Sequence, residues 1–92
     1  MKTKKITRLY IKFPGDGYEV EARDVKGKLF NMNADAFHLS WNKAISKVFM
    51  DYAGEQAGDS YSRLEMPLDA DFLKKMAKNL RALAKHIEEG DV

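Results

Sequence analysis

The sequence predicts an α+β fold in a single domain, residues 1–92. We expect a three-stranded antiparallel meander, a short fourth strand and two helices on one face of the sheet, in the order β-β-β-α-β-α. Three observations predict this: polar and apolar residues alternate early in the chain, apolar residues recur every three to four positions in two later segments, and turn residues separate the segments. A chain of 92 residues is long enough to bury one hydrophobic core.

The first two strands are predicted by alternation on either side of a turn. Residues 8–13 alternate between polar and apolar side chains, and residues 18–23 do the same after the turn sequence PGDG at 14–17. If this loop closes a hairpin, Ile11 lies opposite Val20, and all the apolar pairs fall on one face. We therefore expect the first strand to pair with the second.

The third strand follows a turn whose length can be deduced from the same alternation. A two-residue loop would place asparagines on the buried side, whereas a three-residue loop at 25–27 keeps apolar residues together. The expected pairs are Ala22 with Phe30 and Val20 with Met32. Gly27 is then expected in the left-handed conformation of a bulged turn.

A first helix is predicted between a cap at Asn33 or Asp35 and Gly54. Its apolar residues recur at three- and four-residue spacing: Phe37, Trp41, Ala44, Ile45, Val48 and Tyr52. Leu39 and Met50 fall on the opposite side of this helix. Either they are buried because the helix touches both the sheet and the second helix, or they are exposed as part of a partner or dimer surface.

The fourth strand and the second helix complete the chain. Residues 62–66 are expected to form the short strand. Asp69 is the expected N-cap of the helix, Asp71 favours the helix dipole in the first turn, and Leu68 is placed to pack against Leu73. The expected core face of the helix consists of Leu73, Met76, Ala77, Leu80, Leu83, Ala84 and Ile87.

Four cations are expected along one edge of this helix, here called the basic edge: Lys74, Lys78, Arg81 and Lys85. Like charges four residues apart cost about 0.2–0.5 kcal/mol per pair on an isolated helix, and no acidic residue lies within the arc. One interpretation is a docking edge for phosphates or for an acidic protein. The other is that the long basic side chains cover the margin of the core and keep the domain soluble.

A second cationic group, the basic row, is expected on the outer face of the first strand: Arg8, Tyr10 and Lys12. Alternating basic and aromatic residues are typical of platforms for single-stranded nucleic acid, because rings stack on bases and cations hold the backbone. However, Glu19 and Glu21 are expected beside the row on the second strand, where they would repel phosphate. The basic residues of the N-terminal segment are Lys2, Lys4, Lys5, Arg8 and Lys12.

No motif for catalysis, for a cofactor or for a metal is recognised, so we expect a protein that is not an enzyme and needs no cofactor. The turn at 14–17 lacks the third glycine of a dinucleotide fingerprint. The segment 31–42 has alanine and asparagine where a calcium loop needs glycine and glutamate. His38 and His86 lie on different predicted helices, without the spacing of a metal pair.

The composition predicts a cytoplasmic protein without a membrane span. The chain has no cysteine, which excludes disulfides and favours a reducing compartment. Its start has basic residues but no apolar stretch of the kind found in signal peptides. The net charge is +2, with basic residues concentrated at 1–12 and acidic residues at 54–71. This modest total makes an obligate nucleic-acid binder the weaker expectation.

In its size, its lack of cysteine and of motifs, and its short meander packed against two helices, the chain resembles the small accessory proteins of phages and mobile elements. These include anti-CRISPR and other anti-defence inhibitors. The resemblance implies stoichiometric binding to a host complex through a charged face. We therefore expect a protein-binding module that inhibits a host defence or nucleic-acid-processing complex. The alternative is a nucleic-acid-binding domain that uses the basic row and the basic edge, and a homodimer is a third possibility.

Overall fold

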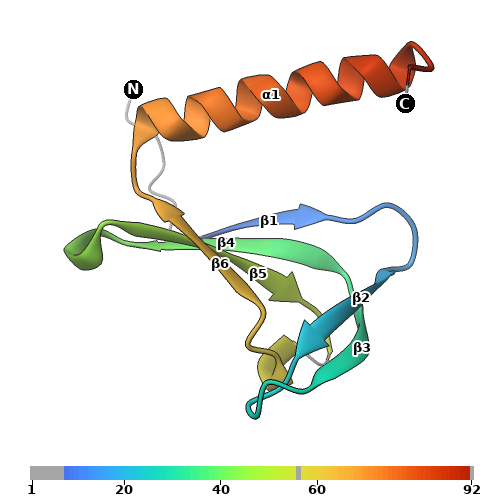
Figure 1. Ribbon diagram of the computed structural model, residues 1–92, viewed down its shortest axis with the longest axis vertical. Coiled ribbons are helices and arrows are strands. Elements are labelled where there is room, and N and C mark those ends of the chain that lie inside the picture. Colours follow the sequence, from blue (N-terminus) through green and yellow to red (C-terminus); the bar gives the residue numbers. More distant parts are fainter. Residues whose placement is uncertain (1–7, 56, 92) are drawn as a thin grey trace, which may run out of the picture.

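Six strands and one long helix make up the part of the chain that the computed structural model describes, residues 8–55 and 57–91 (Figure 1). The elements are β1 (Arg8–Lys12), β2 (Tyr18–Arg23), β3 (Leu29–Ala34), β4 (Ala36–Asn42), the 3-10 turn η1 (Lys43–Ile45), β5 (Lys47–Ala53), the 3-10 turn η2 (Ala57–Asp59), β6 (Arg63–Pro67) and α1 (Ala70–Glu88). The predicted N-terminal cations Lys2, Lys4 and Lys5 lie outside the described residues.

The strands form two antiparallel sheets. The larger has the order β1-β4-β5-β6, and the smaller is the β2–β3 hairpin. Figure 1 shows the hairpin at one end of the larger sheet, where the chain turns from β3 into β4. At this corner the Asp35 amide donates to the Ala53 carbonyl, and the Asp35 carbonyl accepts from the Phe13 amide. The α+β class is therefore confirmed, whereas the three-stranded meander and the first of the two predicted helices are wrong.

Side-chain alternation gives the four-stranded sheet one apolar and one mixed face. Residues paired across neighbouring strands point to the same face. The residues on the apolar face are Leu9, Ile11, Phe37, Leu39, Trp41, Val48, Met50, Tyr52, Leu64 and Met66. The opposite face, here called the polar face, includes Arg8, Tyr10, Lys12, His38, Ser40, Lys47, Phe49, Asp51, Arg63 and Glu65.

The prediction that β1 pairs with β2 is wrong, because β1 pairs with β4 and places Ile11 opposite Phe37. Alternation shows that a segment is a strand with one buried face, but it does not choose the neighbour. In β4 the apolar side chains are larger than those of β2, so β1 buries more apolar surface there. The ring of Phe13, just after β1, contacts the ring of Phe37 at 4.9 Å between centroids.

The predicted helix between residues 35 and 54 is wrong too, since this segment forms β4, η1 and β5. Its apolar residues fit a helical spacing, but they also fit two runs with a period of two, at 37–41 and 48–52. Between the runs, the Asn42 side chain accepts from the Ala44 amide, and Ser46 adopts a left-handed conformation with φ 53°. These local bonds turn the chain, so β4 and β5 pair along their full length.

The β2–β3 hairpin is confirmed in its register. Ala22 pairs with Phe30 and Val20 with Met32. The Asp24 amide donates to the Lys28 carbonyl at 2.9 Å, which leaves the predicted three residues in the loop. Gly27 has φ +82°, a conformation that favours glycine because it has no Cβ. The alternation of side chains between the two faces of the hairpin therefore predicted the length of this turn correctly.

The buried core lies where the hairpin meets the end of the larger sheet. Ala22, Met32 and Ala34 are buried there. The partly buried residues packed around them are Phe13, Val20, Phe30, Tyr52 and Ala57. Across the described residues only two further apolar side chains are buried, Ala36 and Val48. This core is small for a chain of 92 residues.

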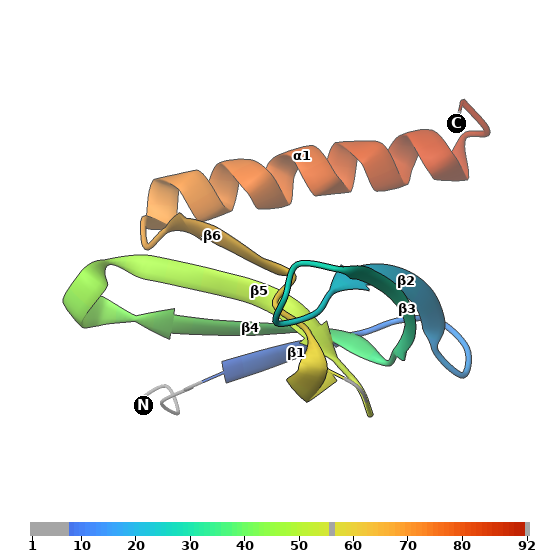
Figure 2. The ribbon, with the colours of Figure 1, turned by 60° about the horizontal axis from the view of Figure 1, so that its bottom comes forward.

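The fourth predicted strand is confirmed as β6, one residue later than expected, and it pairs with β5. Figure 2 shows α1 on one side of the four-stranded sheet, entered directly from the end of β6. No helix in the described part of the chain is long and apolar enough to cross a membrane.

Replacement of Met32 by alanine should lower the free energy of unfolding by about 2–5 kcal/mol, because its side chain is only 2% exposed and its loss leaves a cavity. Met32→Leu conserves volume and should cost less than about 1.5 kcal/mol. Urea denaturation followed by circular dichroism measures both values. Equal losses for the two variants would show that Met32 does not fill the centre of the core.

Candidate functional site

Among the described residues, helix α1 is half-buried against the sheet only in its first two turns. Asp69 caps the helix as predicted, since its side chain accepts from the Asp71 amide at 2.9 Å. Leu73, Met76 and Ala77 are half-buried, but every residue from 78 to 88 is exposed. We call residues 78–88 the projecting half of α1. It extends past the sheet contacts by about three turns, or roughly 16 Å.

The projecting half exposes apolar side chains that were predicted to form core. Leu80, Leu83 and Ile87 are 58%, 48% and 56% exposed. Leu80 and Ile87 follow Leu73 by seven and fourteen residues, so they lie on the same side of the helix as this half-buried leucine. The prediction of one continuous core face on α1 is therefore correct only for its beginning.

All four side chains of the basic edge are exposed: Lys74, Lys78, Arg81 and Lys85. At 100° per residue they lie within an arc of about 60°, centred about 130° from the line of Leu73, Leu80 and Ile87. Among the described residues, none of the four forms an ion pair with an acidic side chain. The structure thus places the predicted cations together, on the outer side of a helix whose residues beyond Ala77 are all exposed within the described part of the chain.

The basic row lies on the polar face of the sheet, and α1 begins on the apolar face. Arg8, Tyr10 and Lys12 are exposed, and the Arg8 guanidinium lies 6.0 Å from the centre of the Tyr10 ring. The predicted neighbours Glu19 and Glu21 belong to the other sheet. Beside the row stands β4 instead, whose side chains on this face carry no acidic group. The basic row and the basic edge consequently lie on different sides of the molecule.

A histidine–carboxylate pair that was not predicted stands beside the basic row. His38 Nδ1 lies 3.1 Å from Asp51 Oδ1, and the His38 ring stacks on Tyr10 at 4.8 Å between centroids. An ionised carboxylate can only accept, so Nδ1 carries the proton in this bond. His38 Nε2 is buried without a partner among the described residues. The pair follows from a β4–β5 hairpin, because a four-residue loop at 43–46 places His38 opposite Asp51.

Two further cross-strand contacts lie between β5 and β6 on the polar face. The Arg63 guanidinium lies over the Phe49 ring, 4.2 Å from its centre. Lys47 Nζ donates to Glu65 Oε2 at 2.9 Å. This hydrogen bond and the charge of Lys47 lower the pKa of the Glu65 carboxyl below its ordinary value of 4.5, with a smaller contribution from Arg63. Acidic side chains therefore lie among the basic ones on this face.

Leu39 and Met50 do not lie on the back of a helix, as the sequence suggested. They face each other across β4 and β5 on the apolar face, and both are half-buried. Open cavities border this face on either side of them. One of about 280 Å³ is lined by Leu9, Leu39, Trp41, Val48, Leu68 and Leu73. Another of about 490 Å³ includes Phe37, Met50, Tyr52 and Leu64 in its lining. The apolar face is thus incompletely covered.

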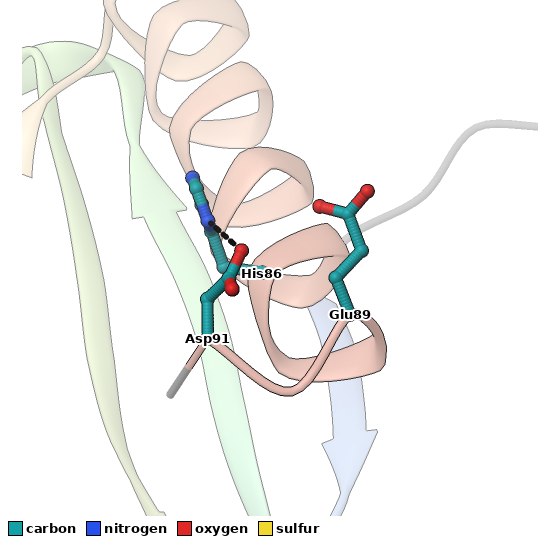
Figure 3. Close-up of side chains that lie close together, drawn as sticks. All are labelled: His86, Glu89 and Asp91. Atoms are coloured by element: carbon teal, nitrogen blue, oxygen red, sulfur yellow. Dashed lines mark hydrogen bonds and ion pairs between the residues drawn. The ribbon is translucent and has the colours of Figure 1, made fainter.

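At the end of α1, three possible metal ligands lie close together: His86, Glu89 and Asp91 (Figure 3). Their ligand atoms lie within 4.8 Å of one another, and His86 Nδ1 is 3.4 Å from Asp91 Oδ2. All three residues are exposed. The one buried polar atom without a partner among the described residues belongs to His38, in the sheet. Nothing else around the cluster points to a bound ion, so its geometry is that of an ordinary exposed helix end.

No family model matches the chain, and neither the curated proteins nor the solved structures include one with significant similarity to it. The surfaces described above therefore have to be interpreted from their own chemistry.

Replacement of Lys47 by alanine should raise the pKa of Glu65 toward its ordinary value of 4.5, because Lys47 supplies both the hydrogen bond and the nearest positive charge. Arg63→Ala should raise it less. Carboxyl titration by NMR measures both shifts. A pKa that is lower in the folded state adds stability above the unfolded pKa, and that stability disappears as the pH falls through the folded value. Lys47→Ala should therefore weaken the acid sensitivity of folding, and an unchanged Glu65 titration would contradict the ion pair.

Proposed function

We propose that this chain is a non-enzymatic protein-binding module that acts in the cytoplasm as a small inhibitor of phage type. Its target is a surface of a host defence or nucleic-acid-processing complex. The projecting half of α1 carries this proposal, because it exposes apolar and basic side chains without packing on the rest of the described chain. Isolated helices shorter than about 12–15 residues are marginal in water, so binding of another chain would stabilise this segment.

The exposed area of the whole chain supports a binding role. It amounts to 7881 Å², whereas a folded monomer of 10.5 kDa exposes about 5,400 Å². Residues 1–7 lie outside the described part of the chain, and seven residues expose at most roughly 1,200 Å² in an unfolded chain. When this area is subtracted, an excess of roughly 1,300 Å² over the compact monomer remains. A standard interface buries about 800 Å² on each partner. The radius of gyration, 15.4 Å, also exceeds the value of about 12 Å for a compact domain of this length.

The chemistry of the target follows from the basic edge. Its cations have no acidic partner among the described residues, so their charge is available to another molecule. Lys78, Arg81 and Lys85 cannot cover the margin of the core, because the helix buries nothing beside them. An acidic protein surface is the complementary partner, and electrostatic attraction would raise the rate of association.

One observation favours nucleic acid as a second candidate. The acidic residues expected beside the basic row, Glu19 and Glu21, lie in the other sheet, so the main objection to a stacking platform is removed. Tyr10 remains exposed beside Arg8, as base stacking requires. Asp51 and Glu65 on the same face still oppose phosphate binding, and this keeps the protein target as the first candidate.

The double variant Lys78→Glu/Arg81→Glu should lose its target complex in capture experiments from a bacterial host lysate. The matched control Lys26→Glu/Lys28→Glu makes the same charge change on the exposed β2–β3 turn and should retain the complex. Quantified bands should show one stoichiometric partner for the wild type and the control. Equal recovery by all three proteins would contradict a role for the basic edge.

Fluorescence anisotropy with labelled single- and double-stranded DNA and RNA tests the second candidate. Nucleic-acid binding predicts affinity that falls steeply between low and physiological salt, because counterions are released from phosphates. Such binding, lost in Arg8→Glu/Lys12→Glu, would replace the protein target by nucleic acid. Weak binding that does not depend on the basic row would leave the first candidate in place.

A further inference from the structure

The apolar residues of α1 follow a strict alternation of three- and four-residue steps. Leu73, Met76, Leu80, Leu83 and Ile87 occupy successive a and d positions of a heptad pattern, and we call them the seam. A seam of this kind is typical of pairing between two helices, and Ala77 and Ala84 widen it on one side, as in helices that face a core. Its last three members are exposed, so the seam lacks a partner along most of its length.

The residues that flank the seam suit the approach of a second helix. One flank has Ala77 and Ala84, which are small and permit close contact. The other has Phe72, Asn79 and His86. No lysine, arginine, aspartate or glutamate stands at these flanking positions within the helix. The cations of the basic edge lie about 150° from the middle of the seam, so two copies can meet without placing like charges opposite each other.

The distribution of charge along α1 favours an antiparallel pair. Lys74 and Lys75 lie near its beginning, whereas Glu88 and Glu89 lie at its end. If Leu80 packs against Leu83 of the second copy, the same register brings the basic beginning of each helix to the level of the acidic end of the other. This attraction acts at a distance, because Lys74 and Glu89 lie on the outer sides of the pair. A parallel pair would instead align lysines with lysines and acids with acids. Opposed helix dipoles add to the preference for the antiparallel arrangement.

We propose that α1, along its seam from the half-buried Met76 to Ile87, forms an antiparallel two-helix interface with a second copy of this chain. Met76 and Ile87 then form the outer layers, and Leu80 and Leu83 form the inner ones. The interface is isologous and closes as a dimer. The whole chain exposes roughly 1,300 Å² more than a compact monomer, and the exposed part of the seam belongs to this excess. The proposal uses the same helix as the proposed function but its opposite side, and it leaves the basic edge exposed for a target.

Sedimentation equilibrium of the full chain tests this interface. We expect the wild type to have twice the 10.5 kDa chain mass at micromolar concentrations, and Leu80→Glu/Leu83→Glu to be a monomer. Both replaced side chains are about half exposed in the monomer, so the sheet should stay folded, which circular dichroism and the NMR signals of the sheet can verify. The control Lys78→Glu/Arg81→Glu should remain a dimer.

A monomeric wild type would overturn the proposal. The seam would then bind the target, a membrane surface or the apolar face of the chain's own sheet. A dimer that persists in Leu80→Glu/Leu83→Glu would overturn it as well. Failure of the proposed function looks different: the basic-edge variant would then bind the target normally, whatever the mass of the wild type. The two conclusions can therefore be rejected separately.

Oxidative cross-linking tests the direction of the pair, because the chain contains no cysteine of its own. In the antiparallel register Ala77 lies near Ala84 of the second copy. The double variant Ala77→Cys/Ala84→Cys should form an intermolecular disulfide, whereas either single variant should not. A dimer that cross-links through Ala77→Cys alone, or that does not cross-link in the double variant, would overturn the antiparallel register.

Discussion

The apolar face of the four-stranded sheet is the constraint on which the rest of the molecule depends. Alternation along β1, β4, β5 and β6 collects their large apolar side chains on one side. Two elements cover this side incompletely: the β2–β3 hairpin at one end and the start of α1 at the other. The free energy of burying the remainder is available only through another chain or another element. Uncovered apolar surface is therefore a property of the fold as a whole, and the proposed partner would bury part of it.

Local signals in the sequence predicted the local parts of the fold. The alternation of apolar and polar side chains predicted the β2–β3 turn, and the capping residue Asp69 predicted the start of α1. Both features depend only on residues that are close together in the sequence. The segment 36–53 could not be resolved in the same way, since its apolar spacing fits one helix and two strands. Leu39 and Met50 were the informative residues. A helix would place both residues opposite its apolar side, whereas two paired strands place both on the apolar face of the sheet.

The same distinction separates the predicted surfaces from the unpredicted ones. The basic edge needs only the periodicity of one helix, and the structure brings its cations together as expected. The His38–Asp51 pair depends on the register of two strands, which a helical interpretation of the segment does not provide. The surroundings of the basic row depend on the neighbour of β1, and this neighbour is distant in the sequence. Nonlocal pairing was therefore the main source of error.

The pairing of β1 with β4 also bears on the order in which the chain folds. The β2–β3 and β4–β5 pairs join neighbouring strands across short turns, whereas β1 and β4 are separated in the sequence by the whole β2–β3 hairpin. Closure of longer loops costs more conformational entropy, and contacts distant in sequence slow folding. We therefore expect β1 to add last, onto an edge that the other strands have already built. The strand that carries Arg8, Tyr10 and Lys12 would then also be the first to open during local unfolding.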